Sequence, residues 1–403
     1  MGRRRLMAER IIYHVDVNSA FLSWTACDIL EQNPSAQDIR EIPSAICGDP
    51  AKRHGIILAK SSPAKKYGVV TAEPIQQALR KCPMLQLYGG DYQLYARRSH
   101  EFMELLRKYA PEVDPFSVDE AFCDMTGTQN LYGDLVEFAH KLKDEIYETL
   151  GFTVNIGVAE NRLLAKMASD FQKPNRVHTL FPEEIATKMW PLPVGDLLFV
   201  GKSSTAALQK MGIHTIGDLA NTPEELLVAR FKSQGHMMWR YANGIDDSGE
   251  ITHDYERKGY SHSVTLPNDI VEAQKAKLVL LSLCEVVAAK LRRDGVKAGT
   301  IAVGITDCEF VHSSRQKKLY SSTDSTQKMY ETVVELFDEL WSHVPIRLLR
   351  VSATNLGNDA EQINLFDMGR SEKQKKLDRA IDSIRNRFGE DSVVRASFVE
   401  HEE

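Results

Sequence analysis

The sequence lacks paired cysteines and long apolar runs. Its six cysteines are scattered and no two form a CxxC pair, so neither a zinc site nor a disulfide framework is expected. No segment has the run of about 18 apolar residues that a membrane span needs, and the basic start leads only into the short apolar stretch Ile11 to Val15. These absences predict a cytoplasmic protein that does not enter a membrane.

The patterns of common hydrolases and ATP-binding proteins are also missing. No segment matches a phosphate-binding P-loop, the 12 histidines are dispersed, and no Ser/His/Asp or Cys/His pairing is visible. The formal net charge is -6, whereas proteins that bind nucleic acid usually carry a basic surface. Local basic stretches at residues 60–66 and 315–318 weaken this objection, because the acidic last residues lower the total. Nucleic-acid binding therefore stays open.

The composition is ordinary for a large globular protein. Hydrophobic residues make up 43% of the sequence and charged residues 26%. A chain of 403 residues is long enough for three or four units of about 100 residues each. We expect a multidomain fold that mixes helices and strands, of the α/β or α+β class.

The first part of the chain predicts an α/β layer with its helices on one face of the sheet. Strands are expected at residues 10–17, 121–125 and 152–158, and helices at residues 21–30, 92–109 and 135–150. Residues 40–80 indicate an inserted subdomain, and residues 112–117 indicate a loop.

The second part predicts two further units and a tail. Short helices broken by Gly and Pro are expected at residues 174–250. Residues 254–356 predict a second α/β unit, with strands at 299–306 and 348–356 and helices at 272–291 and 325–341. The tail begins with a polar stretch at 357–361 and contains an amphipathic segment at 377–388.

Three carboxylates give the clearest chemical signal. Asp16 ends the first expected strand, and Asp119 and Glu120 are adjacent in a turn between two strand-like runs. Adjacent carboxylates repel each other, so exposing both is costly unless a cation lies between them. In a two-metal site, shared carboxylates hold magnesium ions about 3.5 to 4 Å apart for phosphoryl transfer. For a single acidic pair, a solvated surface turn is the alternative interpretation.

The segments around these carboxylates resemble the Y-family of DNA polymerases, and most closely its bacterial polymerase IV branch. VDVNSAF is similar to the family's first catalytic segment, SVDEAFCDMT to the second and GVAENRLLAKMASDFQKPN to the third, in the same order and spacing. The resemblance implies a template-directed polymerase of low fidelity, which adds deoxynucleotides to a primer 3′ end and passes damaged bases. Its partners would be primer-template DNA and deoxynucleoside triphosphates.

The resemblance also implies a right-hand architecture and a metal site. The palm would comprise residues 10–26 and 81–173, the fingers 27–80, the helical thumb 174–250, the little finger 254–356, and a tail 357–403. Two Mg²⁺ ions would be held by Asp16, the main-chain carbonyl of Val17, Asp119 and Glu120. Asn18 replaces an acid that is common in the family, and a neutral amide is a poor magnesium ligand.

The nucleotide site implied by the resemblance departs from the family pattern at one place. Phe21 matches the steric gate, whose ring would clash with a ribose 2′-hydroxyl and favour deoxynucleotides. The expected nucleotide contacts are Ala20, Phe21, Ser62, Lys65 and Lys173. The departure is that Ser62 and Pro63 replace a Tyr-Glu pair, and that Lys65 stands where arginine is usual.

Two further segments resemble partner-binding motifs. Residues 200–212 resemble a helix-hairpin-helix, in which backbone amides at a helix start approach a DNA phosphate. Its DNA contacts would be Gly201, Lys202 and Gly212. The tail resembles the peptide that binds the bacterial sliding clamp, through Gln362, Leu365 and Phe366.

Two other functions stay open at this point. A non-catalytic DNA- or clamp-binding scaffold with a decayed site is one, although it would not need to keep three costly carboxylates. A nucleotidyl cyclase with a similar palm is the other, suggested by Gly89-Gly90-Asp91. Tyr92-Gln93 replaces the acid and aromatic residue expected next in a cyclase, so we interpret this segment as a turn before a helix. We expect a monomer.

Overall fold

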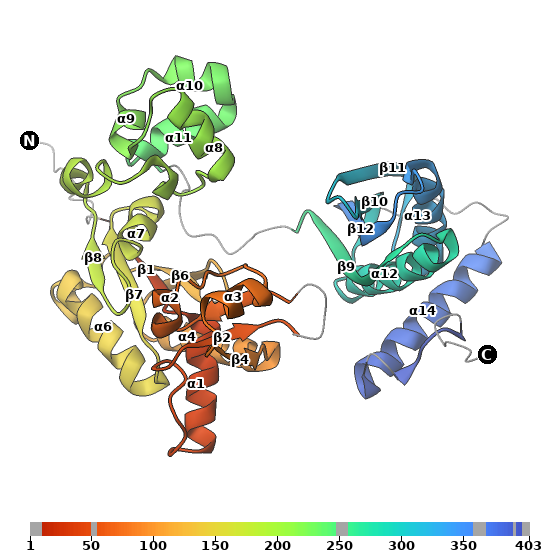
Figure 1. The fold of residues 1–403 in the computed structure, drawn as a ribbon, viewed down its shortest axis with the longest axis horizontal. Helices are drawn as coiled ribbons and strands as arrows, with labels where there is room; N and C mark the ends of the chain where they lie inside the picture. Colours follow the sequence, from red (N-terminus) through yellow and green to blue (C-terminus); the bar gives the residue numbers. More distant parts are fainter. Residues whose placement is uncertain (1–9, 50–54, 247–256, 358–367, 390–391, 397–403) are drawn as a thin grey trace, which may run out of the picture. The chain divides into compact units, whose positions relative to one another are not determined.

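The chain forms two compact units, residues 1–253 and 254–403. The computed structural model describes residues 10–49, 55–246, 257–357, 368–389 and 392–396 (Figure 1). Among these described residues, no helix combines the length and the hydropathy that crossing a bilayer requires.

A five-stranded sheet forms the centre of the first unit. Its strand order is β5 (Glu112–Pro115), β6 (Glu120–Asp124), β1 (Ile12–Val17), β7 (Val154–Ala159) and β8 (Val177–Thr179). β1 pairs antiparallel with both β6 and β7. The expectation of a loop at residues 112–117 was wrong, because four of these residues form β5. Val113 is buried there opposite Cys123, which makes a strand more favourable than a solvated loop.

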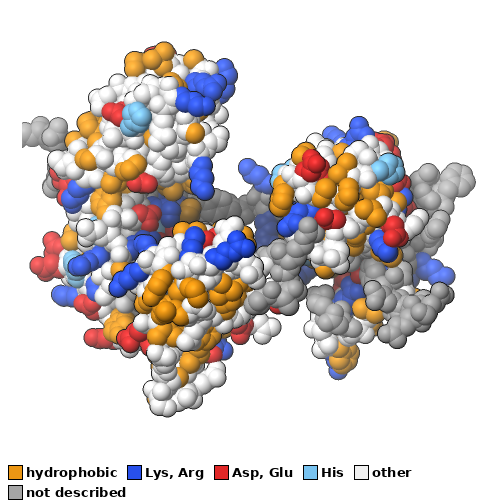
Figure 2. All heavy atoms as spheres, in the orientation of Figure 1, with side chains coloured by type: hydrophobic (Ala, Val, Ile, Leu, Met, Phe, Trp, Pro, Cys, Tyr) orange, Lys and Arg blue, Asp and Glu red, His pale blue; other side chains and the backbone are white. Residues whose placement is uncertain are grey.

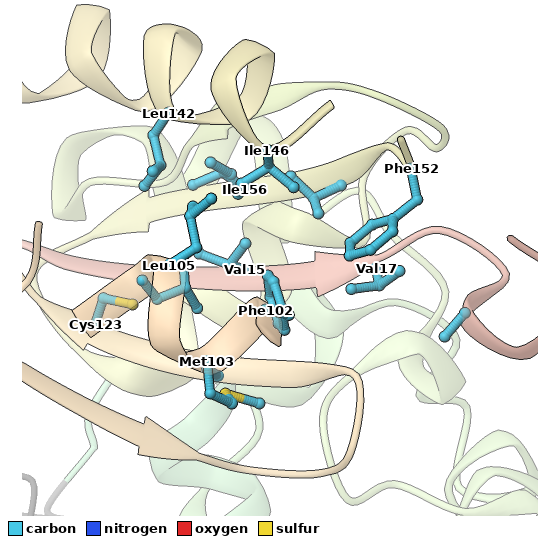
Figure 3. Packing of buried hydrophobic residues seen from close by; sticks show 14 of the residues in the cluster. Val15, Val17, Phe102, Met103, Leu105, Cys123, Leu142, Ile146, Phe152 and Ile156 are labelled. Atoms are coloured by element: carbon cyan, nitrogen blue, oxygen red, sulfur yellow. The ribbon is translucent and has the colours of Figure 1, made fainter. Parts of the chain in front are cut away.

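One face of this sheet packs on helices α1 (Ala20–Gln32), α4 (Tyr92–Arg107) and α6 (Leu135–Leu150), with the short α5 (Gln129–Tyr132) beside α6. Figure 3 shows Val15 of β1 and Ile156 of β7 converging with Leu105 of α4 and Ile146 of α6. Such interdigitated burial is the main stabilising contribution in a core of this kind.

The opposite face packs on α7 (Arg162–Ser169), so the expectation of helices on one face was wrong. The reason lies in the strands, whose side chains are apolar or buried on both sides. Ile12 and Phe122 pack with α7, whereas Val15 and Cys123 belong to the other core. Gly157 allows α7 to come close, since a Cβ atom there would lie 1.9 Å from the carbonyl oxygen of Ala165.

A smaller three-stranded sheet forms a subdomain within the first unit. Its strand order is β3 (Ile57–Lys60), β2 (Ser44–Cys47) and β4 (Gln86–Gly89), covered by α2 (Ser62–Lys66) and α3 (Ile75–Lys81). Figure 2 shows hydrophobic side chains gathered over the region of α3 and β4. Tyr67, Val70 and Met84 are exposed hydrophobic residues of this subdomain.

The remainder of the first unit is helical, as expected. It consists of η1 (Pro182–Glu184), η2 (Ile185–Met189), η3 (Val194–Asp196), α8 (Lys202–Lys210), α9 (Ile216–Ala220), α10 (Glu224–Phe231) and α11 (Ser233–Ala242). Its apolar side chains share one core with α7, from Leu163 through Leu227 to Ala242. The helix that borders the carboxylates is therefore anchored on both sides.

The second unit is a four-stranded antiparallel sheet with helices on one face. The strand order is β11 (His312–Thr323), β10 (Lys297–Asp307), β12 (Ile346–Gly357) and β9 (Gly259–Ile270). Ile301 and Val351 pack against α12 (Ala273–Arg293) and α13 (Thr326–Leu340). The strands and helices expected at residues 272–356 are confirmed.

The last helix, α14 (Met368–Phe388), is fastened to this unit by charged side chains. Arg292 of α12 pairs with Asp382 at 2.6 Å, and Arg385 pairs with Glu285 at 3.0 Å. Asp378, which is 2% exposed, accepts a hydrogen bond from the backbone N–H of Thr326 at 3.2 Å. Asp378 of α14 thus accepts a hydrogen bond from a free backbone amide at the start of α13. In most helices the side chain of the N-cap residue accepts such a bond, but the N-cap Ser325 does not.

We expect Gly157→Ala to destabilise the first unit by at least about 2 kcal/mol, because the new Cβ would overlap the α7 backbone and force α7 off the sheet. Gly89→Ala is the matched control, since nothing lies within 4 Å of the Cβ position there. Urea unfolding followed by circular dichroism measures both. Equal midpoints for the two variants would contradict the proposed close contact of α7 with β7.

Candidate active site

Strand pairing brings the three predicted carboxylates together. Asp16 lies directly opposite Glu120 in the β1–β6 register. The backbone N–H of Val17 donates to the carbonyl of Asp119 at 3.0 Å, which fixes Asp119 at the same edge. The side chain of Val17 is buried in the core, so only its main chain is available to a ligand.

Glu120 is held by two donors from the chain. His14 of β1 approaches its Oε2 through Nε2 at 3.0 Å, and Lys166 of α7 forms an ion pair with the same oxygen. Burial raises the pKa of Glu120, but the hydrogen bonds from His14 and Lys166 outweigh burial and lower it to about 2. Glu120 is therefore ionised and oriented throughout the physiological pH range.

His14 is itself fixed behind the carboxylates. It is fully buried, and its Nδ1 lies 2.8 Å from the hydroxyl of Ser169. Burial lowers the pKa of His14, which favours the neutral ring, and Nε2 is placed to donate to Glu120. His14, Lys166 and Ser169 were not predicted as site residues from the sequence. The signal for the last two was their place in the third catalytic segment, on the helix face turned to the sheet.

Asp16 has a different environment. Its side chain is 14% exposed and pairs with Lys173 at 2.7 Å. Burial raises the pKa of Asp16 to about 6, despite the opposing effect of Lys173. Asp119 instead accepts a hydrogen bond from the hydroxyl of Ser117 at 2.6 Å. The negative charge of Asp16 is thus only partly compensated by the chain.

This group of residues fits a divalent cation. One ligand atom each of His14, Asp16 and Glu120 lies within 4.8 Å of the others. Carboxylate oxygens are the ligands that Mg²⁺ and Mn²⁺ prefer, and the costly ionised form of Asp16 would be stabilised by a cation. Asn18 points elsewhere, because its amide bonds to Asn155 at 3.1 Å and its carbonyl oxygen accepts from Thr153 at 3.0 Å.

The predicted steric gate lies in an aromatic cluster formed by α1 and α4. Ala20 and Phe21 open α1, and Phe21 stacks on Tyr95 of α4 with ring centroids 4.4 Å apart. The hydroxyl of Tyr95 lies 3.2 Å from that of Thr25. Asp91 caps α4, as expected for a turn before a helix. Tyr95 was not predicted from the sequence, because its contact with Phe21 depends on the packing of two helices.

The other predicted residues belong to α2, to the segment around α8 and to the tail. Ser62 and Lys65 are on α2, and neither forms a hydrogen bond or ion pair with the three carboxylates in the described structure. Gly201 is the N-cap of α8, Lys202 is its first residue, and Gly212 follows its end with φ of 82°, all three exposed. The clamp-like residues Gln362, Leu365 and Phe366 lie outside the described residues.

Comparisons with known proteins agree over nearly the whole chain. Residues 15–170 match the impB/mucB/samB family, and residues 257–365 match the C-terminal domain of that family. The chain is 43% identical to DNA polymerase IV of Clostridium acetobutylicum, over 98% of this chain and 99% of that protein. It is 37% identical to DNA polymerase IV 2 of Bacillus subtilis, over 97% and 95% of the two chains.

The fold is similar to a solved structure as well. A Y-family DNA polymerase chimera built from Dbh and Dpo4 superposes with a TM-score of 0.73. The match covers 88% of this chain and 100% of that chain, at 23% sequence identity.

We expect Asp16→Asn to stabilise the metal-free protein by roughly 1 to 3 kcal/mol at pH 8. The pKa of Asp16 is raised in the folded protein, so folding favours its protonated form. The stability that this contributes is fully present below the ordinary pKa of 3.8 and is lost as the pH rises through about 6. Asparagine carries no such pH dependence, so the advantage of the variant should vanish near pH 4.

Thermal unfolding in EDTA between pH 4 and pH 8 tests this expectation. Asp170→Asn is the control, because Asp170 also contacts Lys173 but its side chain is 53% exposed. A lower melting temperature for Asp16→Asn than for the wild type at pH 8 would contradict the claim that the ionised form of Asp16 destabilises the folded protein.

Proposed function

This chain belongs to the impB/mucB/samB family, the Y-family polymerases that include DNA polymerase IV, and from that premise we propose how its carboxylates support nucleotide addition. It is a DNA-directed DNA polymerase of the translesion kind, with a mixed α/β fold that matches a Y-family polymerase. Its activity is metal-dependent, and the acidic group that includes Asp16 and Glu120 can hold a metal ion.

Asp16, Asp119, Glu120 and the carbonyl of Val17 hold two Mg²⁺ ions. The observation that supports this ligand set is the register of β1 and β6, which places Asp16 opposite Glu120 with Asp119 beside them. When bound, the two ions activate the primer 3′-hydroxyl and neutralise charge on the triphosphate. Lys166 and His14 keep Glu120 ionised and oriented for this role.

The incoming nucleotide lies between the carboxylates and the small subdomain. Lys173, at the palm edge, binds the triphosphate as a cation, and Ser62 and Lys65 of α2 approach it from the other side. α2 carries a serine and a lysine in place of a tyrosine and an arginine, so this half of the site offers a shorter hydroxyl and a single point charge. The triphosphate therefore depends more on Lys173 than is usual in the family.

Phe21 selects deoxynucleotides. Its ring is backed by the buried Tyr95 and has little freedom to move away from a ribose 2′-hydroxyl, with Ala20 alongside on α1. A steric filter works only if the excluding group cannot yield, and a stacked ring meets that requirement.

The units correspond to the parts of a right-hand polymerase. We assign residues 10–26 and 81–173 to the palm, 27–80 to the fingers, 174–250 to the thumb and 254–356 to the little finger. Gly201, Lys202 and Gly212 of the thumb present backbone amides and a positive charge to a DNA phosphate.

The little finger offers a second DNA surface, on the sheet face turned away from α12 and α13. Cross-strand pairing places neutral or basic residues on that face, and none of these paired positions carries a carboxylate. They are Gly259, Ser261, Ser263, Thr300, Ala302, Gly304, Ser314, Gln316, Lys318, Arg350, Ser352 and Thr354. Small hydroxyl side chains and a few cations suit contact with a phosphate backbone.

The tail following the little finger, residues 357–403, binds the bacterial sliding clamp through Gln362, Leu365 and Phe366. The support is the sequence pattern, in which Leu365 and Phe366 follow Gln362 and Ile363 in a segment between β12 and α14 that is otherwise largely polar. The protein acts as a monomer in the cytoplasm, where DNA and deoxynucleotides are present.

A primer-extension assay with Mg²⁺ tests the catalytic site. We expect Asp119→Ala to lower the rate of primer extension at least about 100-fold, because it removes one of the proposed ligands of the Mg²⁺ ions that stabilise the charge of the transition state. Asp144→Ala, on the exposed surface of α6, is the control and should retain activity. Extension by Asp119→Ala at the wild-type rate would rule out this ligand set.

Phe21→Ala should raise the ratio of ribonucleotide to deoxynucleotide kcat/KM by about 10- to 1,000-fold, since it removes the steric clash. Tyr92→Ala is a matched control, because the ring of Tyr92 meets that of Phe21 edge-on, with ring centroids 6.3 Å apart, but Tyr92 is mostly exposed. It should leave the ratio unchanged. If Phe21 served only as packing, its removal would lower both kcat/KM values equally.

A further inference from the structure

Two lysines compensate the carboxylates, and they differ in how firmly they are held. Lys166 pairs with Glu120, its side chain is 12% exposed, and its ammonium lies 5.0 Å from the centre of the Phe116 ring. Lys173 comes from the loop after α7, and its side chain is 36% exposed. Lys166 is thus enclosed by the protein, whereas Lys173 has a path to solvent.

Lys173 contacts two acids at once. Its ammonium lies 2.7 Å from Oδ2 of Asp16 and 2.8 Å from Oδ1 of Asp170. Asp16 is the carboxylate that a metal ion needs, and Asp170 is half-exposed and lies outside the ligand set. The lysine therefore bridges the metal site and a nearby anchoring group.

The position of Lys173 conflicts with simultaneous metal binding at Asp16. An ammonium and a divalent cation about 5 Å apart repel each other enough to weaken metal binding roughly tenfold, even at the dielectric constant of water. Without any cation, however, the nearly buried carboxylate of Asp16 would be left uncompensated. A lysine that can leave satisfies both requirements.

We propose that Lys173 is the exchangeable counter-ion of Asp16: it neutralises this carboxylate before a divalent cation arrives and moves to the triphosphate when the cation replaces it. Asp170 keeps the ammonium beside the site during this exchange. The inference rests on the proposed function, since the triphosphate is the group that receives Lys173. Each ligand then favours the other, because the triphosphate draws away the charge that opposes the metal ion.

Binding of Mn²⁺ to the full-length protein without nucleotide tests the inference, with free Mn²⁺ measured by electron paramagnetic resonance. Lys173→Met should bind Mn²⁺ about tenfold more tightly than the wild type. Lys173→Arg keeps the charge and should bind like the wild type. Lys188→Met is the matched control, because the Lys188 side chain has a similar exposure of 39% but pairs with Glu184, and it should bind Mn²⁺ unchanged.

The nucleotide KM of the same variants separates this inference from the proposed function. Tighter Mn²⁺ binding by Lys173→Met supports the counter-ion role, whatever happens to KM. Unchanged or weaker Mn²⁺ binding overturns it, even if KM rises and the triphosphate role stands. Lys173→Gln repeats the measurement with a different neutral side chain, and circular dichroism checks that each variant is folded.

Discussion

The repulsion between carboxylates on neighbouring strands is the constraint that organises the first unit. β1 and β6 pair so that Asp16 and Glu120 face each other, with Asp119 adjacent. Such a pair is unfavourable without positive charge nearby. The protein answers with α7 and the loop after it, which bring Lys166 and Lys173 to the sheet edge. The position of α7 depends in turn on Gly157 and on the helical core beyond it.

The two sides of the site are built to different degrees of rigidity. Glu120 is locked by a buried histidine and an enclosed lysine, and it is ionised without a metal ion. Asp16 is paired with a lysine that reaches solvent, and burial makes its charge unfavourable. One carboxylate thus defines a fixed point, while the other responds to its ligand. A site of this kind can exist empty without collapsing and still bind cations.

Much of this organisation could be predicted from the sequence, for identifiable reasons. The strand at Ile12–Val17 and the helices at residues 92–107 and 135–150 follow from hydrophobic periodicity, which depends only on local residue order. The family and the polymerase fold followed from three long motifs, and the comparisons confirm both. The roles assigned to individual site residues stay predictions.

What the sequence did not reveal depends on contacts between distant segments. His14 looks like an ordinary strand residue until β6 places Glu120 against it, and Tyr95 looks like a helix residue until α1 places Phe21 on its ring. β5 was not predicted as a strand, because Pro115 and the acidic residues beside Val113 are typical of a loop, although Val113 is buried. The helix on the second face of the sheet was not predicted, because a strand that is buried on both sides shows no alternation of polar and apolar residues to distinguish its two faces.

The anchoring of α14 has a consequence for how the protein is made. Domains generally fold as units while the ribosome is still adding residues, starting from the N-terminus. The first compact unit is complete once residue 253 has emerged, whereas α13 in the second unit receives its cap from Asp378 only after residue 378 has emerged. The first unit can therefore be assembled on a nascent chain whose second unit is still unfinished.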